Sequence, residues 1–273
     1  MSLKMESTLA SAYEGRLGVA VEIAIAAGQV TLEYFQKTNY QVQRKRDRSP
    51  VTNADVEAEK LIRSRLAEMF PRDAILGEEL GEQAGSSEYQ WIVDPIDGTK
   101  SFISGVPVYS TLVGVTYKGQ CVIGAIAIPA LNEVVFAGKG QGAWYSKAGS
   151  VPQRAQVSSR DQLEDSLFVL SQVDGFASRG SMENYLAIEK RSFITRTWGD
   201  GYGYLLVATG RAEMMIDPIV NPWDAAAILP VIQEAGGRCT DWSGVESYRS
   251  GDLVATNGLL HDQVLDLLKN KST

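Results

Sequence analysis

The stretch Trp91-Ile92-Val93-Asp94-Pro95-Ile96-Asp97-Gly98-Thr99 is the part of the chain that decides its fold and chemistry. Asp94 ends an apolar run typical of a buried strand, a proline interrupts that run, and Asp97-Gly98-Thr99 has the composition of a turn that opens a helix. Such a turn brings both carboxylates to one strand end, with the Ile96 carbonyl between them. Oxygen ligands suit Mg²⁺, and the start of a helix offers N–H groups to phosphate. An Asx turn with a helix cap is the alternative.

Composition excludes several classes of protein. A chain of 273 residues that is 44% hydrophobic is long enough for one large domain or two tightly packed halves. With 33 acidic against 26 basic residues and a net charge of -7, it lacks the basic surface that nucleic acids or anionic membranes require. No apolar run approaches the about 20 residues of a membrane span, and the N-terminus lacks a signal-peptide pattern. As a partner, a small phosphorylated metabolite would therefore need help from a metal or from local cationic groups.

Histidine and cysteine are too scarce for several kinds of catalytic site. The only histidine, His261, follows Leu259-Leu260 in a predicted terminal helix, where a surface or helix-end role is expected. Cys121 and Cys239 are far apart and are expected to be unpaired core thiols in a reducing cytoplasm. A zinc site, a Cys-His pair and a Ser-His-Asp triad are therefore unfavourable interpretations. Any chemistry must use oxygen ligands.

Hydrophobic periodicity divides the chain into two halves, residues 1–150 and 151–273, which form one compact unit. In the first half, apolar positions at three- and four-residue steps predict a helix over 9–35 and a second one that begins near Thr52 and Asn53 and stops at Pro71. The pattern then changes towards a period of two and predicts an antiparallel sheet. The predicted strands cover residues 74–76, 90–94, 108–117, 121–128 and 133–137.

The second half alternates between helix and strand. We expect strands over 166–171, near Phe193, over 212–217 and over 253–255. The expected helices cover 182–190, 202–209 and 223–235, followed by a terminal helix. This alternation predicts a second α/β layer and an α+β fold overall.

Two further acidic positions strengthen the metal interpretation. Glu78, in Gly77-Glu78-Glu79, follows a short strand, although alone it is typical of a solvated loop. Asp224 follows Trp223 at a predicted helix start, where a cap is the simplest role. Together with Asp94 and Asp97 these residues supply enough carboxylate oxygens for two or three Mg²⁺ ions.

These three segments, with Glu234-Ala235-Gly236-Gly237 downstream, resemble the inositol monophosphatase family of lithium-sensitive, Mg²⁺-dependent phosphatases in order and spacing. The resemblance covers most of the chain. It implies a layered αβαβα sandwich of the inositol monophosphatase and fructose-1,6-bisphosphatase type, and a homodimer. It also implies hydrolysis by a metal-activated water, without a covalent enzyme intermediate.

The resemblance further implies a role for each residue of the site. The metal ligands would be Glu78, Asp94, the Ile96 carbonyl, Asp97 and Asp224. Thr99 would orient the attacking water, and Glu78 and Asp55 would also serve catalysis. The phosphate would be held by the N–H groups of Gly98 and Thr99, with Asp97 and Asp224 close to the substrate.

Two other segments have simpler alternatives. Residues 44–55 correspond to the family's mobile metal-proximal loop through Thr52 and Asp55, and the alternative is a solvated basic loop before a capped helix. The glycine-rich segment 138–142 precedes Trp144-Tyr145-Ser146, a predicted strand, which indicates a hairpin turn rather than a dinucleotide loop.

The second half determines which ester is bound. Residues 196–224, including Gly199-Asp200 and Asp217, resemble the histidinol-phosphate phosphatase branch of the family. Asp200 and Asp217 would accept charge-assisted hydrogen bonds from the ammonium and imidazole groups of histidinol phosphate, together with Gly199 in the substrate site. The alternative is that Asp200 caps a helix and Asp217 ends a strand.

We therefore expect a histidinol-phosphate phosphatase. An inositol-1-phosphate or broader sugar-phosphate phosphatase is the nearest alternative. A non-catalytic metal- or phosphate-binding regulatory partner is the alternative from a different class.

Overall fold

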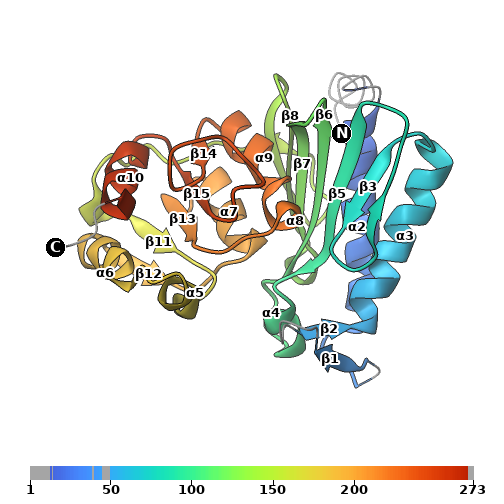
Figure 1. Ribbon diagram of the computed structural model, residues 1–273, viewed down its shortest axis with the longest axis horizontal. Coiled ribbons are helices and arrows are strands. Elements are labelled where there is room, and N and C mark those ends of the chain that lie inside the picture. The colour runs from blue at the N-terminus through green and yellow to red at the C-terminus, as the bar shows by residue number, and fades with distance from the viewer. Residues whose placement is uncertain (1–12, 14, 39, 45–49, 270–273) are drawn as a thin grey trace.

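Helices and sheets alternate in five layers in the computed structural model, which describes residues 13, 15–38, 40–44 and 50–269 (Figure 1). Helices α2 (Arg16–Leu32) and α3 (Asn53–Met69) cover the outer face of the larger sheet, and α7 (Gly201–Ala208) and α9 (Ile228–Glu234) lie between the two sheets. Beyond the second sheet lie α5 (Val173–Ser178), α6 (Met182–Arg191) and α10 (His261–Lys269). The predicted αβαβα sandwich is confirmed.

The larger sheet has eight strands in the order β10-β9-β8-β7-β6-β5-β3-β4. Neighbouring strands are antiparallel except β3 and β5, which are parallel. Gly138 pairs with Gly142 across β8 and β9, so the glycine-rich segment is the hairpin turn that the sequence predicts. The strands are β3 (Ala74–Gly77), β4 (Gly81–Gln83), β5 (Tyr89–Asp97), β6 (Ser110–Tyr117), β7 (Gln120–Ile128), β8 (Glu133–Gly138), β9 (Gly142–Lys147) and β10 (Gln153–Arg154).

The second sheet has five strands in the order β12-β11-β13-β15-β14. Strand β11 is parallel to both of its neighbours, whereas β15 is antiparallel to β13 and β14. All four predicted strands are present with slightly different bounds, and β14 is additional. The strands are β11 (Leu167–Val169), β12 (Ile194–Arg196), β13 (Met214–Asp217), β14 (Arg238–Thr240) and β15 (Leu253–Thr256).

Several predicted elements have other bounds. The first helix begins at Arg16, and residues 9–12 of the prediction lie outside the described part of the chain. The helix predicted over 223–235 is two helices, α8 (Pro222–Ala225) and α9. Pro230 has no N–H to continue a long helix but fits the first turn of a new one. The remaining short elements are β1 (Val42–Arg44), β2 (Pro50–Thr52), α4 (Thr99–Ile103), η1 (Pro129–Leu131) and η2 (Leu163–Asp165).

The junction of α8 and α9 packs directly on the larger sheet, backbone against backbone. A Cβ added to Gly124 on β7 would lie 1.9 Å from the Ala227 carbonyl oxygen, and one on Gly114 of β6 would lie 2.8 Å from the Ala226 carbonyl carbon. Glycine permits this close approach because it has no side chain. The contact fixes α8, which carries Asp224, against β5 and β6.

His261 is the first residue of α10, so the helix-end expectation is confirmed, but the surface expectation is wrong. The side chain is completely buried. Its Nδ1 lies 3.0 Å from Thr256 Oγ1 and its Nε2 lies 2.9 Å from Thr240 Oγ1. These two hydroxyls satisfy both ring nitrogens, which permits burial of the ring.

Both cysteines are free, as predicted, and Cys239 is buried, whereas Cys121 is only partly buried. In the described residues, no helix combines the length and the apolar character needed to cross a membrane.

Candidate active site

A bulge in β5 places Asp94 and Asp97 on the same side of the sheet. Asp94 pairs with Leu112 and Asp97 with Ser110, so three steps on β5 match two on β6. Without this extra residue, side chains three positions apart would point to opposite faces. The strand therefore continues through Pro95 to Asp97 instead of ending at Asp94, which corrects the predicted turn. Thr111 Oγ1 donates to the Pro95 carbonyl at 2.8 Å, and bulges tolerate proline because no ladder N–H is needed there.

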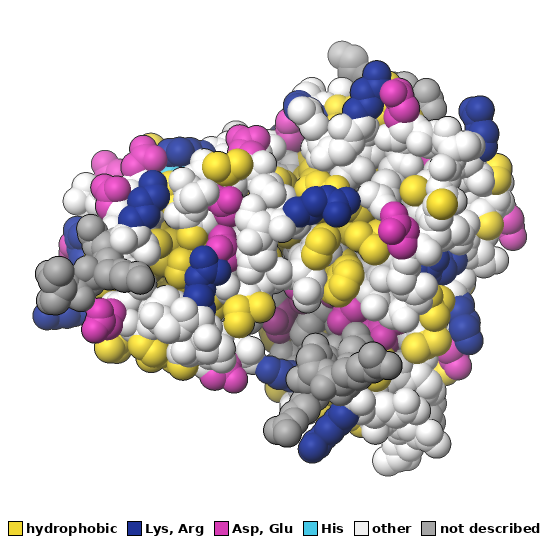
Figure 2. Space-filling model, viewed as in Figure 1, with side chains coloured by type: hydrophobic (Ala, Val, Ile, Leu, Met, Phe, Trp, Pro, Cys, Tyr) yellow, Lys and Arg dark blue, Asp and Glu magenta, His cyan; other side chains and the backbone are white. Residues whose placement is uncertain are grey.

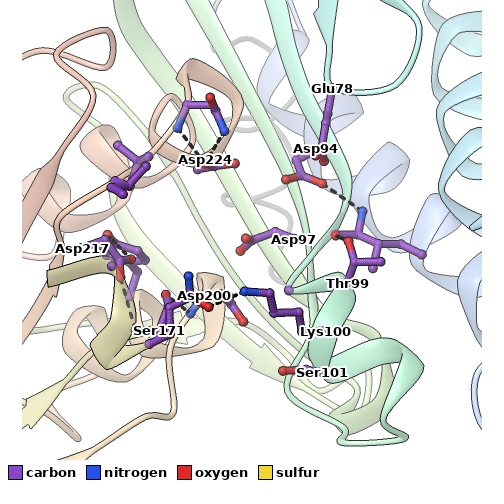
Figure 3. Close-up of a pocket in the computed structure, with 18 of the residues that line it drawn as sticks. Glu78, Asp94, Asp97, Thr99, Lys100, Ser101, Ser171, Asp200, Asp217 and Asp224 are labelled. Atoms are coloured by element: carbon purple, nitrogen blue, oxygen red, sulfur yellow. Dashed lines mark hydrogen bonds between the residues drawn. The ribbon is translucent and has the colours of Figure 1, made fainter. Parts of the chain in front are cut away.

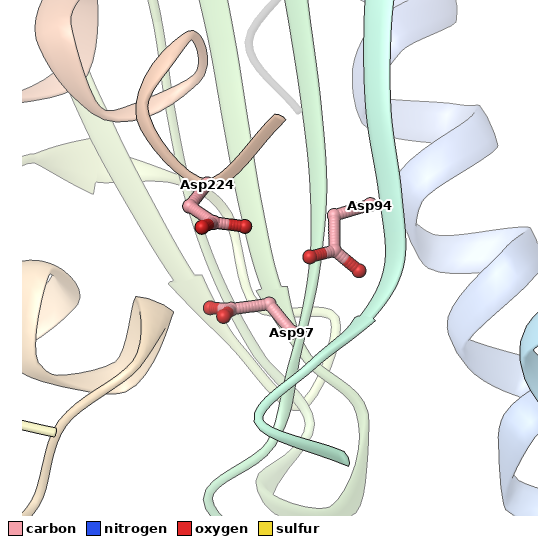
Figure 4. Close-up of side chains that lie close together, drawn as sticks. All are labelled: Asp94, Asp97 and Asp224. Carbon is pink, nitrogen blue, oxygen red and sulfur yellow. The ribbon is translucent and has the colours of Figure 1, made fainter. Parts of the chain in front are cut away.

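Asp94, Asp97 and Asp224 form a tight carboxylate cluster (Figure 4). Each contributes one oxygen to a set whose members all lie within 4.8 Å of one another. Backbone N–H groups orient two of them, since Ile96 donates to Asp94 Oδ1 at 3.0 Å and Asn221 donates to Asp224 Oδ2 at 2.7 Å. Asp224 thus has the predicted cap role and also faces the cluster.

Asp97 is held by donors from two other elements. Ser110 on β6 donates its hydroxyl to Asp97 Oδ2 at 2.7 Å, and the Gly201 N–H at the start of α7 donates to the same oxygen. Because both donors use Oδ2, they fix the direction in which the carboxylate faces Asp94 and Asp224.

Glu78 lies beside this cluster through strand pairing. Gly77, the last residue of β3, pairs with Val93, and the Glu78 N–H donates to the Val93 carbonyl at 3.2 Å. The next residue on β5 is Asp94, so the two acids are neighbours across the sheet edge (Figure 3). The solvated-loop alternative does not describe this position.

Asp55 is part of a helix cap on α3. Its Oδ2 accepts from the Thr52 N–H at 2.8 Å and from the Thr52 hydroxyl at 2.5 Å. Its Oδ1 is buried and has no hydrogen-bond partner among the described residues. Burial raises the pKa of Asp55 to about 6, although the Thr52 bonds oppose the shift. Residues 45–49 of the predicted basic loop lie outside the described part of the chain.

The electrostatics of the cluster favour a bound cation. Burial raises the pKa of Asp94 well above its ordinary value, and the charges of Glu78, Asp97 and Asp224 raise it further. Burial and the charges of Asp200 and Asp224 likewise raise the pKa of Asp97 well above its ordinary value. Burial raises the pKa of Asp224 to about 7. Buried like charges are unfavourable unless an opposite charge compensates them. The donor set, all oxygen, and the unpartnered Asp55 oxygen fit a hard divalent cation.

The cluster opens into a cavity of about 290 Å³ between the two halves of the chain. Figure 2 shows acidic side chains in the depression between these halves. One wall comes from β5 and α4, with Asp97, Gly98 and Thr99, and the opposite wall from the second half (Figure 3). The structure thus brings Asp200 and Asp217 into the same cavity as the cluster. Gly199 does not line this cavity, because it packs against the backbone of Ser171.

Asp217 ends β13, as the alternative interpretation states, and also faces the cavity. The Ser171 N–H donates to its Oδ1 at 3.2 Å and the Tyr204 hydroxyl to its Oδ2 at 2.9 Å. Burial, together with the charge of Asp200, raises its pKa to about 6. Asp217 is therefore an oriented, almost fully buried acceptor.

Asp200 occupies the N-cap position of α7, but its side chain makes no capping hydrogen bond, so the helix-cap alternative is wrong for its carboxylate. Its backbone has φ 56° and ψ −157°, a conformation that is strained for any residue other than glycine. Its N–H donates to Ser171 Oγ at 2.9 Å. Burial raises the pKa of the Asp200 carboxyl, whereas a side-chain hydrogen bond with Ser171 and the charge of Lys100 oppose this rise.

Comparison with known proteins identifies the family and the fold. The sequence model of the inositol monophosphatase family matches residues 13–273. The chain belongs to the inositol monophosphatase family. A histidinol-phosphatase of Chlorobaculum parvum is 39% identical over 93% of this chain and 96% of its own length. A histidinol-phosphatase of Mycobacterium tuberculosis is 39% identical over 92% of this chain and 97% of its own length. The structure of an IMPase of Thermotoga maritima superposes on this chain with a TM-score of 0.82. The two sequences are 31% identical, and the match covers 93% of this chain and 96% of the other.

Membership of the inositol monophosphatase family makes this chain a phosphoric monoester hydrolase. It also confirms the predicted sandwich, which the Thermotoga maritima structure shares over nearly all of the chain. The family uses divalent metals, in agreement with the acidic cluster described above.

Several residues of this phosphatase site were not predicted. Lys100, directly after Thr99, extends across the cavity from α4, and its Nζ donates to Gln172 Oε1 (Figure 3). Its position next to the central motif is the one local signal that could have identified it. Ser110, Ser171 and Tyr204 have no such signal, because strand pairing and packing between distant segments create their contacts.

Proposed function

We propose that this phosphatase hydrolyses L-histidinol phosphate to L-histidinol and phosphate with Mg²⁺. The observation that carries the proposal is the presence of Asp200 and Asp217 in the cavity that contains the carboxylate cluster. A phosphate bound at the cluster would direct the ammonium and imidazole of histidinol phosphate towards these acids, which accept charge-assisted hydrogen bonds. Both relatives named as histidinol-phosphatases support the same substrate.

In this proposal, two or three Mg²⁺ ions are held by Glu78, Asp94, Asp97, Asp224 and the Ile96 carbonyl. Bound Mg²⁺ would neutralise these carboxylates and lower the pKa of a bound water. The first half of the chain, residues 1–150, supplies all of these ligands except Asp224, and the second half, residues 151–273, supplies the groups that select the alcohol.

The chain's own groups orient the water and the phosphate. The Thr99 hydroxyl donates to the Ile96 carbonyl at 3.1 Å, so its oxygen lone pairs are left to accept a proton of the attacking water. We propose that the proton of that water passes to Glu78 or Asp55, two acids that interact electrostatically with each other. The backbone N–H groups of Gly98 and Thr99, at the start of α4, would hold the phosphate oxygens.

Lys100 modifies how the alcohol is recognised. Its ammonium interacts electrostatically with Asp200 and donates to Gln172. An incoming substrate ammonium would therefore share Asp200 with Lys100, whereas the hydrogen-bond donors to Asp217 among the described residues, Ser171 and Tyr204, are neutral. Asp217 is the stronger candidate for contact with the substrate ammonium.

The test is phosphate release by the purified protein from histidinol phosphate and from inositol 1-phosphate. We expect release with Mg²⁺, none with EDTA, and none from the Asp97→Asn variant. A higher kcat/KM for inositol 1-phosphate would reject the proposed substrate and favour the alternative of an inositol or sugar-phosphate phosphatase, which the 31% identity to an IMPase supports. Absence of release from every monoester tested would favour a non-catalytic binding role.

A further inference from the structure

Glu59 is a completely buried carboxylate on α3 that faces the turn carrying Glu78. A buried carboxylate is unfavourable unless hydrogen bonds or a counter-ion compensate it. Glu59 has both kinds of partner. Its Oε2 accepts from the Glu79 N–H at 2.8 Å, and its Oε1 accepts from the Leu80 N–H at 3.2 Å and from Arg63 Nε at 2.8 Å.

These contacts hold the part of the turn between Glu78 and the start of β4. The two N–H groups bound by Glu59 belong to the two residues that directly follow Glu78. Arg63, which pairs with Glu59, also donates through its second nitrogen to the carbonyl of Gly81, the first residue of β4. The turn is thus attached to α3 by one carboxylate and one guanidinium.

Gly77 leaves the space that the carboxylate occupies. A Cβ at residue 77 would lie 2.0 Å from Glu59 Oε1 and 2.4 Å from its carboxyl carbon, so any other residue would displace Glu59. The glycine of the Gly77-Glu78-Glu79 motif is therefore explained by Glu59, a residue 18 positions earlier that the motif does not contain.

We propose that Glu59 is a positioning residue for the metal site. By fixing the Glu79 and Leu80 N–H groups, it sets the direction of the Glu78 side chain towards Asp94. Groups that orient metal ligands contribute to metal affinity without touching the ion. This inference rests on the proposed function in one respect, which is that Glu78 is a metal ligand.

The test is Mn²⁺ binding by the full-length protein, measured by the electron paramagnetic resonance signal of free Mn²⁺. In Glu59→Gln, one oxygen becomes an NH₂ group that faces a backbone N–H or Arg63 Nε, so the turn loses a contact. We expect the Kd for Mn²⁺ to rise about 10- to 100-fold. The Mg²⁺ concentration for half-maximal phosphate release should rise in parallel, with the substrate KM little changed.

Glu213 offers a matched control. It is also completely buried, and it accepts from one backbone N–H, that of Leu167 at 2.7 Å, and from Arg160 at 3.0 Å. These contacts lie in the second sheet, away from the carboxylate cluster. Glu213→Gln should lower the free energy of unfolding but leave the Kd for Mn²⁺ unchanged.

Each outcome decides one of the two proposals. Failure of the wild-type protein to bind Mn²⁺ would reject the proposed metal site itself. Wild-type binding with an unchanged Kd in folded Glu59→Gln, or an equal loss of affinity in Glu213→Gln, would overturn the positioning role. If Glu59→Gln does not fold, the Kd for Mn²⁺ of Arg63→Met decides whether the positioning role holds. The Arg63 side chain lies nearer the surface than that of Glu59. An unchanged Kd in that variant would reject the inference, and a several-fold higher Kd would support it.

Discussion

The carboxylates of Asp94 and Asp97 share one face of β5 because the strand contains one more residue between them than β6 contains opposite. Strand geometry alone would direct them to opposite faces of the sheet. The bulge therefore creates the carboxylate cluster, and it also brings like charges together where solvent access is limited. We therefore expect the stability of the protein to depend on a bound cation.

The Asp97→Asn variant should show this dependence. In EDTA we expect it to melt at a higher temperature than wild type, since one of the clustered, partly buried like charges is removed. A gain of ~1 kcal/mol would raise Tm by about 2–4 °C. Mg²⁺ should raise the Tm of wild type, by up to ~3 kcal/mol of stability at 100-fold excess over Kd, but should not raise that of the variant. Calorimetry in both buffers checks this.

The difference in stability between metal-free Asp97→Asn and metal-free wild type should depend on pH in a definite direction. Because the pKa of Asp97 is raised in the folded state, its ionisation destabilises the metal-free fold as pH increases. The advantage of Asp97→Asn should therefore disappear below the ordinary carboxyl pKa of 3.8. The control is Asp262→Asn, which removes an exposed acid outside the cavity. It should change neither the Tm in EDTA nor the rise in Tm with Mg²⁺. A Mg²⁺-dependent rise in Tm for Asp97→Asn would contradict the metal assignment.

Asp217→Asn should weaken binding of histidinol phosphate specifically. Asparagine keeps an oxygen for the Ser171 N–H, and the Tyr204 hydroxyl can turn to accept from the new NH₂ group, so the fold should persist. Loss of a charge-assisted hydrogen bond of about 1.5–3 kcal/mol predicts a KM higher by about 10- to 100-fold. Steady-state kinetics with inositol 1-phosphate as the neutral-tailed comparison should show a smaller change. An equal change for both esters would argue against ammonium recognition.

Asp200→Gly should separate stability from substrate selection. Glycine adopts φ 56° and ψ −157° without the strain of about 1–3 kcal/mol that other residues incur there, so Tm should rise. The KM for histidinol phosphate should rise as well, because a carboxylate of the cavity is lost. Asp200→Asn, which retains the strain, should give the kinetic effect without the gain in Tm. A lower Tm in the glycine variant would show that the observed backbone is not strained.

Protonation of His261 should reduce the free energy of unfolding of the protein as the pH falls. Burial lowers its pKa from 6.5 to about 4, so between these values the unfolded chain binds a proton that the folded chain does not. Stability contributed by the neutral ring is therefore present above pH 6.5 and is lost as pH falls towards 4, at up to about 1.4 kcal/mol per pH unit. The free energy of unfolding, measured with urea across this pH range, should change less steeply with pH in His261→Asn than in wild type.

Nuclear magnetic resonance gives an independent check on the same residue. The chain has one histidine, so its ring proton signal needs no assignment. The signal should titrate well below pH 6.5 in the folded protein. A titration near 6.5 would contradict the burial of the ring between Thr240 and Thr256.

The sequence contained enough information for the layers of the fold and for the carboxylates. Apolar spacing identified the helices that pack on the larger sheet, and the acids of the site follow short apolar strands or begin a helix. These are local properties, because side-chain period and turn chemistry are set by a few neighbouring residues.

The features that could not be predicted depend on distant segments. The bulge in β5 is a property of its register with β6, so residues 91–99 alone suggest a turn. His261 is buried because threonines on β14 and β15 satisfy its ring, and Lys100 crosses a cavity to reach a residue of the other half. The strained backbone of Asp200 has no sequence signal either, since its neighbours Gly199 and Gly201 suggest flexibility.

The contact between Gly124 and the Ala227 carbonyl has a consequence for natural variation and for engineering. Neither residue carries a charge or lines the cavity, yet a single methyl added at Gly124 would approach the carbonyl oxygen to 1.9 Å. Such a clash would push α8 away from β5 and move Asp224 out of reach of Asp94 and Asp97. A survey of tolerated substitutions should then find Gly114 and Gly124 intolerant, although both lie in the apolar interior, and any variant that still folds should show a lower metal affinity.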